Sequence, residues 1–316
     1  MRKYIVGRLL MLIPMLLGAS FIIFFMLRLG RGDPALDYLR LSQIPPTDEA
    51  IAEARNMLGL NRPIMVQYGS WLWNALHLDF GKSYVTHKPV MEDFLYYLPA
   101  SLQLGSVAFL FIMLVSIPLG MWAAANRDRW PDQLVRYFSF VGVSLPNFWL
   151  GFLLVLFFSI WLDWLPPFGR DEPGSIIMPV ITLSLMSLSV NARLLRSSML
   201  EVKGQRYVLW AAMRGLPGSQ VTVRHVLRNA MLPLLTAAGM HLAELIGWSM
   251  VVETIFAWPG VGRWSINAIY NRDFPVLQCF TMVMTTMFVL MNLGIDILCA
   301  WLDPRIRYSG ESQGGH

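Results

Sequence analysis

Residues 207–233 read YVLWAAMRGLPGSQVTVRHVLRNAMLP and lie between two apolar segments that are each long enough to cross a lipid bilayer. The first part, residues 208–213, is apolar with small side chains, and Gly215 with a Pro-Gly pair beyond it marks the end of a short helix. Ala211, Ala212 and Gly215 recur at one-turn spacing, which lets another protein approach the helix backbone closely. The stretch therefore predicts a docking helix. The alternative is an ordinary basic loop that carries a surface helix.

The composition of the chain indicates a polytopic membrane protein. Of its 316 residues, 55% are hydrophobic and 14% are charged, whereas charged residues make up about a quarter of a soluble domain. The net charge of +5 fits the excess of Lys and Arg on the cytoplasmic side of membrane proteins. No basic stripe interleaved with stacking aromatics is present, which excludes nucleic acid as a partner. The two cysteines, Cys279 and Cys299, lack the spacing of a metal site.

Six apolar segments predict an all-α membrane protein with six transmembrane helices. They cover residues 1–29, 101–125, 137–162, 175–192, 234–252 and 276–302. The third segment is interrupted at Ser144–Asn147, where a Leu-Pro pair predicts a bend. Lys and Arg gather in the short loops of one side, which places both termini in the cytoplasm. Arg193 and Arg196 are expected to mark that membrane boundary.

The predicted organisation has four parts. They are a first transmembrane helix at 1–30, an extracytoplasmic region at 31–97, a five-helix core at 98–302 with a cytoplasmic coupling loop at 198–231, and a cytoplasmic tail at 303–316. In the extracytoplasmic region, Asp48–Leu58 is predicted to be a helix that starts after Thr47 and stops at Gly59. A second amphipathic stretch, Pro63–Leu78, carries aromatics that are expected near a lipid headgroup layer: Tyr68, Trp71 and Trp73.

A series of short motifs along the chain resembles one family. The motifs are GDP (32–34), LGLNRPIMVQYGSWL (58–72), LDFGKS (78–83), LPASLQL (98–104), SLPNFWLG (144–151), RHVLRNAMLP (224–233), VETIFAWPGVG (252–262), NRDFPV (271–276) and DPRIR (303–307). In order and spacing they resemble the dipeptide, oligopeptide and nickel branch of ABC importer permeases. The docking stretch resembles the coupling loop of those permeases, with Ala211, Ala212, Gly215 and Leu232-Pro233 in the family's places and Leu209 where the family has an acidic residue.

Within that branch, the sequence is most similar to the first of the two permease subunits of nickel importers. The segment GMHLAELIG (239–247) carries this subdivision, together with ALDYLRLS (35–42) and LHLDFGKS (76–83). The function implied is import of nickel, as a chelate. Importers of dipeptides, oligopeptides, glutathione or metallophores share the scaffold and stay as alternatives.

The resemblance implies a type I ABC importer permease fold in the cytoplasmic (inner) membrane. It also implies four kinds of partner: a second permease subunit, two ATPase subunits, an extracytoplasmic solute-binding protein and the lipid bilayer. The chain has no Walker-type phosphate loop and no catalytic constellation, so it is not expected to be an enzyme. No cofactor is expected on this chain, and ATP with Mg would bind the partner ATPases. Tyr207 would anchor the coupling helix and Gly215 would terminate it.

Three residues of the fifth apolar segment are expected to line the substrate path: Met240, His241 and Glu244. His241 and Glu244 stand three residues apart, on nearly one helix face, and ionisable groups inside a membrane span are commonly functional. No residue is assigned as a metal ligand. The alternative is a hydrogen bond that serves packing. A secondary transporter or channel that uses His241, Glu244 and Asp296 as a proton or ion relay is the competing function of another class.

Overall fold

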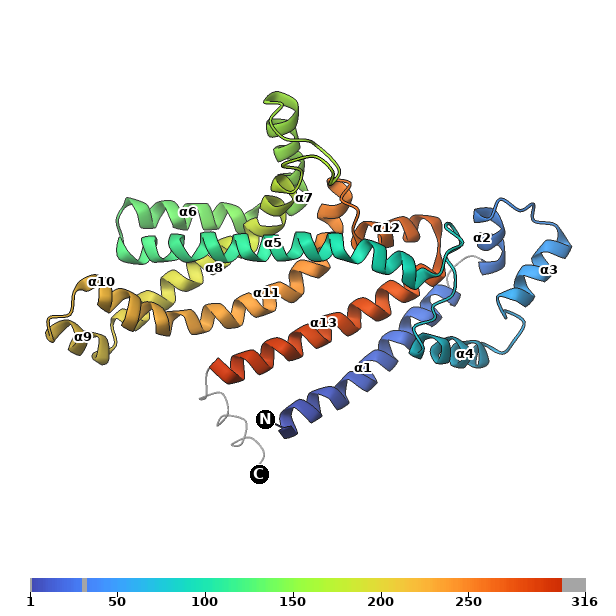
Figure 1. Ribbon diagram of the computed structural model, residues 1–316, viewed down its shortest axis with the longest axis horizontal. Helices are drawn as coiled ribbons and strands as arrows, with labels where there is room; N and C mark the ends of the chain where they lie inside the picture. Colours follow the sequence, from blue (N-terminus) through green and yellow to red (C-terminus); the bar gives the residue numbers. More distant parts are fainter. Residues whose placement is uncertain (1, 30–32, 303–316) are drawn as a thin grey trace. The chain divides into compact units, whose positions relative to one another are not determined.

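The computed structural model describes the backbone of residues 2–29 and 33–302, and the regular elements of that part are all helices, joined by loops and turns. The only strand-like pairing in the described residues is an isolated bridge between Lys82 and Pro89. The all-α prediction is therefore confirmed (Figure 1). The chain divides into two compact units, Met1–Ser101 with Pro259–Met291, and Leu102–Trp258 with Asn292–His316.

Unit 1 contains the first helix and the polar region that follows it. Its elements are α1 (Arg2–Leu29), α2 (Pro34–Leu41), α3 (Asp48–Met57), α4 (Ile64–Leu76), the start of α5 (Val90–Ala125), α12 (Val261–Asn271) and most of α13 (Phe274–Leu302). The predicted start of α3 is confirmed, because the Thr47 hydroxyl accepts a hydrogen bond from the Ala50 N–H at 3.2 Å. Gly59, just past its end, has φ +65°, as the stop signal requires.

Aromatic side chains hold α4 against α1. Tyr68 and Trp71 lie with ring centroids 5.4 and 5.6 Å from that of Phe24, which is fully buried. The Tyr68 hydroxyl is 2.8 Å from the hydroxyl of Ser20. Two of the three aromatics expected near headgroups therefore pack on α1, and only Trp73 is largely exposed.

A buried carboxylate fastens the loop after α4 to the start of α13. Asp273 accepts hydrogen bonds from the Ser83 hydroxyl at 2.5 Å and from the backbone N–H of Tyr84 at 3.1 Å. Burial raises the pKa of Asp273 above its ordinary value, although these hydrogen bonds and one from the Val85 N–H oppose the rise. Tyr84 is itself buried, and its pKa is raised for the same reason. The pair Ser83 and Asp273 thus joins segments that are 190 residues apart.

Unit 2 is a helical layer with α8 at its centre. Its further elements are α6 (Trp130–Ser144), α7 (Asn147–Leu154), the π-helix η1 (Val155–Trp161), α8 (Ile177–Lys203), α9 (Arg206–Met213), α10 (Gly218–Gln220), the π-helix η2 (Val221–Leu227) and α11 (Arg228–Ile255). The helices α6, α7 and α11 all contact α8. Glycine makes the α6–α8 contact close, because a Cβ on Gly142 would collide with the Ser189 side chain.

Within the described residues, four helices are long and apolar enough to cross a membrane. They are α1 from Leu9, α5, α8 and α13 as far as Ile295, and a fifth is obtained if α6 and α7–η1 form one broken span. The bend predicted at Ser144–Asn147 is confirmed, and it measures 104°. The segment predicted as the fifth span forms α11, a helix of 28 residues.

Two helices extend beyond the segments predicted as membrane spans. The helix α8 continues past Ala192 to Lys203. The polar stretch after Gly218 is helical, and η2 runs directly into α11. Between the fifth and sixth predicted segments lies a helix, α12, that the sequence analysis did not predict.

Candidate functional site

The short helix α9 runs from Arg206 to Met213, where the sequence predicts a docking helix. Gly215 follows with φ +78°, a left-handed conformation that glycine adopts without strain, and this confirms the predicted stop. Val208 and Ala211 are buried in a cluster with Leu195 of α8. The helix is therefore fixed to the end of α8 by its own apolar side.

The outer side of α9 is exposed. Tyr207 is 45% exposed, and Ala212 and Gly215 are exposed as well. Ala211 differs from the other small residues expected to meet a partner, because it is only 7% exposed and packs inside the unit. The surface offered by α9 thus consists of its larger side chains together with Ala212 and Gly215.

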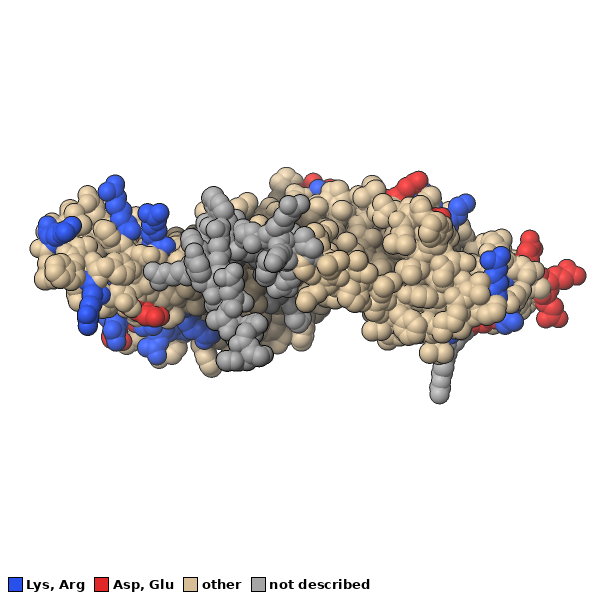
Figure 2. All heavy atoms as spheres, turned by 90° about the horizontal axis from the view of Figure 1, so that it is seen from below, with Lys and Arg blue, Asp and Glu red and all other residues tan. Residues whose placement is uncertain are grey.

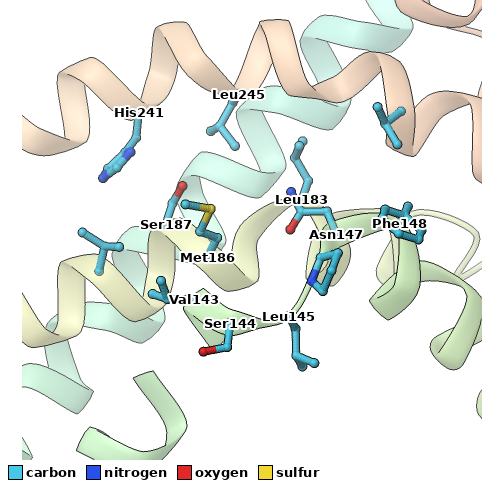
Figure 3. A pocket seen from close by; sticks show the side chains of 13 residues that line it. Val143, Ser144, Leu145, Asn147, Phe148, Leu183, Met186, Ser187, His241 and Leu245 are labelled. Carbon is cyan, nitrogen blue, oxygen red and sulfur yellow. The ribbon is translucent and has the colours of Figure 1, made fainter. Parts of the chain in front are cut away.

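A pocket of about 610 Å³ opens at the break between α6 and α7. Its walls come from three places: the break itself, α8 and α11. Most of the lining is aliphatic or aromatic, and the polar members are Ser144, Asn147, Ser187 and His241. In Figure 3 the side chains of His241, Ser187 and Asn147 surround a shared space, with the thioether of Met186 beside Ser187.

The structure separates the three residues expected to line the substrate path. His241 lines the pocket. Met240 is 58% exposed and is not part of the lining. The side chain of Glu244 lies outside the described residues, as does that of Asp296. Among the side chains that the structure describes, no group of three or more His, Cys, Asp or Glu is placed to hold a metal ion.

The sequence analysis did not predict that Asn147 and Ser187 line a pocket. Asn147 starts α7 directly after Pro146, so the helix break was a signal that this side chain could face a cavity. Ser187 was one of several hydroxyl residues on α8, and nothing in the sequence distinguishes it from its buried neighbours Ser184 and Ser189.

An ion pair that the sequence analysis also missed lies between α6 and α8. Asp132, in the first turn of α6, is fully buried. Arg196 donates to it from both Nε and Nη2, the latter at 2.6 Å, and the Asp128 N–H donates to the same carboxylate at 3.0 Å. Arg196 is therefore not merely a marker of the membrane boundary, because its guanidinium joins two helices.

An all-helical chain with several apolar spans, a broken helix and a pocket at the break is typical of polytopic membrane transport proteins. Residues 116–308 match the family described as binding-protein-dependent transport system inner membrane component, and residues 1–105 match the N-terminal part of such membrane components. The chain belongs to this family, the permease subunits of ABC importers.

Similar proteins cover nearly the whole chain. A dipeptide transport system permease protein of Alkalihalophilus pseudofirmus is 36% identical, with 98% of this chain and 100% of the relative aligned. A glutathione transport system permease protein of Salmonella paratyphi A is 38% identical over the same shares. A putative peptide transport system permease protein of Brucella abortus is 39% identical, again over 98% and 100%.

Solved structures share the fold. A chain of the MetNI methionine ABC transporter in an inward-facing conformation aligns with a TM-score of 0.57 at 17% identity, covering 68% of this chain and 99% of that one. A likeness at this identity shows the fold alone, and it agrees with the predicted type I importer permease.

Proposed function

We propose that this permease subunit carries a short peptide or a peptide-like molecule through the pocket at the α6–α7 break. The observation that carries the proposal is the chemistry of the lining. It is largely apolar, with the neutral polar groups Ser144, Asn147 and Ser187 and one imidazole, His241. Such a wall suits amide groups and apolar side chains, because a few hydrogen-bonding groups orient a ligand that apolar contacts hold.

The relatives support this cargo class. Their names refer to dipeptide, glutathione and peptide transport. A chelated nickel ion, which GMHLAELIG suggested, is the second candidate, favoured by His241 in the pocket wall. A bare Ni²⁺ ion fits less well, since it prefers several imidazole or carboxylate ligands together.

The proposed topology has six transmembrane helices with both termini in the cytoplasm. It counts α6 with α7–η1 as one broken span and adds α11 to the four helices that are apolar by themselves. In this arrangement α9 faces the cytoplasm and the helices α2 to α4 face the opposite side. The experiment is cysteine labelling from outside the cell. A cysteine at Glu49 should react with an impermeant reagent and one at Gln220 should not.

The proposed complex contains a second permease, two ATPases that bind ATP with Mg, and an extracytoplasmic solute-binding protein. The exposed side of α9, with Tyr207, Ala212 and Gly215, would seat in an ATPase. Because α9 packs directly on the end of α8, which also lines the pocket, a movement of the ATPase would reach the pocket through one continuous helix.

Competition for uptake tests the cargo. In vesicles that contain the whole complex, unlabelled dipeptides and tripeptides should reduce uptake of a labelled peptide that the binding protein delivers. Chelated nickel should not compete. Uptake that survives ATP depletion but stops when the proton gradient collapses would contradict the importer class and favour a secondary transporter.

A further inference from the structure

Two hollows on the surface of unit 2 adjoin α9, and arginines line both. The first, of about 540 Å³, includes Arg206 and Arg214, which stand at the two ends of α9. The second, of about 830 Å³, includes Arg224 of η2 and Arg228 at the start of α11. The hollows share Tyr207 and His225, so they form one surface. Neither lining contains an acidic residue.

The four arginines, 206, 214, 224 and 228, are all exposed. The ion pairs of the described residues involve other basic residues, and Arg196 shows the contrast because Asp132 binds its guanidinium group. Figure 2 shows Lys and Arg side chains gathered at the end of unit 2 that carries α9 and α10 in Figure 1. Positive charges that lie close together repel one another. An anionic surface placed against the four arginines would offset this repulsion and would be attracted to them.

The centre of the same surface is apolar. Leu209, Trp210 and Met213 of α9 are 54%, 64% and 72% exposed. Trp, Met and Arg are the residue types enriched in protein interfaces, where an apolar centre is surrounded by a polar rim. The arrangement is thus that of a protein contact with a basic rim. We call it the α9 face, defined by Leu209, Trp210 and Met213 with the four arginines.

We propose that the α9 face binds a cleft of the partner ATPase whose rim carries acidic side chains. The proposal rests on the function proposed above, in which α9 meets the ATPase, and adds the chemistry of that partner. Guanidinium groups bind carboxylates with two parallel hydrogen bonds, so arginines on both sides of α9 would fix its position as well as attract the cleft. Leu209 stands where the family resemblance places an acidic residue, so this position adds no negative charge among the four arginines.

Charge reversal tests the proposal in the intact complex. Arg206→Glu, Arg214→Glu, Arg224→Glu and Arg228→Glu are made singly in a tagged permease that is co-expressed with its partners. Each reversal should weaken ATPase retention roughly tenfold, and more at low salt than at high salt. The matching Arg→Lys variants, which keep the charge, should retain most of the ATPase. Arg127→Glu is the control, since Arg127 is an exposed arginine away from both hollows.

A second arm identifies the partner surface. Changing an acidic residue at the rim of the ATPase cleft to Arg should restore retention by an Arg→Glu variant but not by the wild-type permease. Normal retention by all four reversal variants would overturn the proposal. So would a loss that follows the content of anionic lipid in nanodiscs and is equal for Arg127→Glu, because the arginines would then bind lipid headgroups. Failure of the wild-type permease to retain any ATPase would instead contradict the proposed function itself.

Discussion

Arg196 of α8 binds the buried carboxylate of Asp132 in the first turn of α6, with its Nη2 atom 2.6 Å from Oδ2. The two helices it joins both contribute to the pocket at the α6–α7 break, and α8 also leads to α9. A close contact at Gly142 and Ser189 holds the same helices together further along. The helices α6 and α8 are therefore fastened at two places and are expected to move as one body.

Removal of the Asp132 carboxylate should destabilise the packed pair of helices α6 and α8. Asp132→Asn leaves the Arg196 guanidinium, whose side chain is only 17% exposed, without its carboxylate. Breaking a buried ion pair costs about 3 kcal/mol or more. The thermal unfolding midpoint of the purified complex should therefore fall. The double variant Asp132→Asn with Arg196→Met should be less damaging than the sum of the single changes, and strict additivity would show that the pair is not coupled.

The glycine at the α6–α8 contact gives an independent test of the packing. Gly142→Ala should cost about 1–3 kcal/mol, because the added methyl group overlaps the Ser189 side chain. Gly105→Ala, in α5, is the matched control, since a Cβ there meets nothing within 4 Å. Adding Ser189→Ala to Gly142→Ala should recover part of the midpoint. Equal midpoints for the two single glycine variants would contradict the close contact.

The pocket account predicts different roles for two adjacent residues. His241→Ala should reduce the rate of peptide uptake several-fold, because it removes the imidazole from the pocket wall. Met240→Ala should leave uptake near normal, since Met240 lies outside the lining. Assembly with the ATPases, measured by size-exclusion chromatography, should be unchanged in both. Equal uptake by the two variants would remove His241 from the proposed path.

The loop held by Asp273 should respond to pH in a defined direction. Burial raises the pKa of Asp273 in the folded protein above its ordinary value of 3.8. The folded state then binds the proton of Asp273 more tightly than the unfolded state does. The resulting contribution to the free energy of unfolding is present at low pH and is lost as pH rises through the folded-state pKa. Asp273→Asn should abolish this loss. The thermal unfolding midpoint of the variant, relative to that of the wild type, should therefore rise from acid toward neutral pH. Parallel profiles of midpoint against pH would contradict this assignment.

Asp33 provides the control of opposite sign. Partial burial favours its neutral form, but hydrogen bonds from Arg55, at 2.6 Å, and from the Ala35 N–H outweigh this effect and lower its pKa. The ionised Asp33 therefore contributes to the free energy of unfolding above its unfolded-state pKa, and this contribution is lost as pH falls through its folded-state pKa. The thermal unfolding midpoint of Asp33→Asn should therefore lie below that of the wild type at neutral pH, and the two midpoints should converge in acid.

Local signals in the sequence were sufficient for several elements. Gly215 fixed the end of α9, Thr47 and Gly59 bounded α3, and the Leu-Pro pair placed the bend after Ser144. These signals work because each acts within one turn of the backbone.

Long-range contacts were not predictable in the same way. Asp132 and Arg196 are 64 residues apart, and no periodicity relates them. The pocket combines side chains from α6, α7, α8 and α11, so only the packing of the helices shows that Asn147, Ser187 and His241 meet. The sequence led us to expect chelated nickel as the cargo, through His241 and Glu244, with peptides as an alternative. The names of the relatives and the lining of the pocket instead support the peptide-like cargo proposed above.

The most direct test of the central claim is ATP hydrolysis by the complete complex in lipid vesicles with its binding protein. Short peptides should stimulate hydrolysis several-fold and should be accumulated inside the vesicles, and both effects should weaken in His241→Ala. Chelated nickel should produce neither effect. If chelated nickel stimulates hydrolysis and uptake while peptides do not, the proposed cargo is wrong and the pocket at the α6–α7 break carries a metal complex instead.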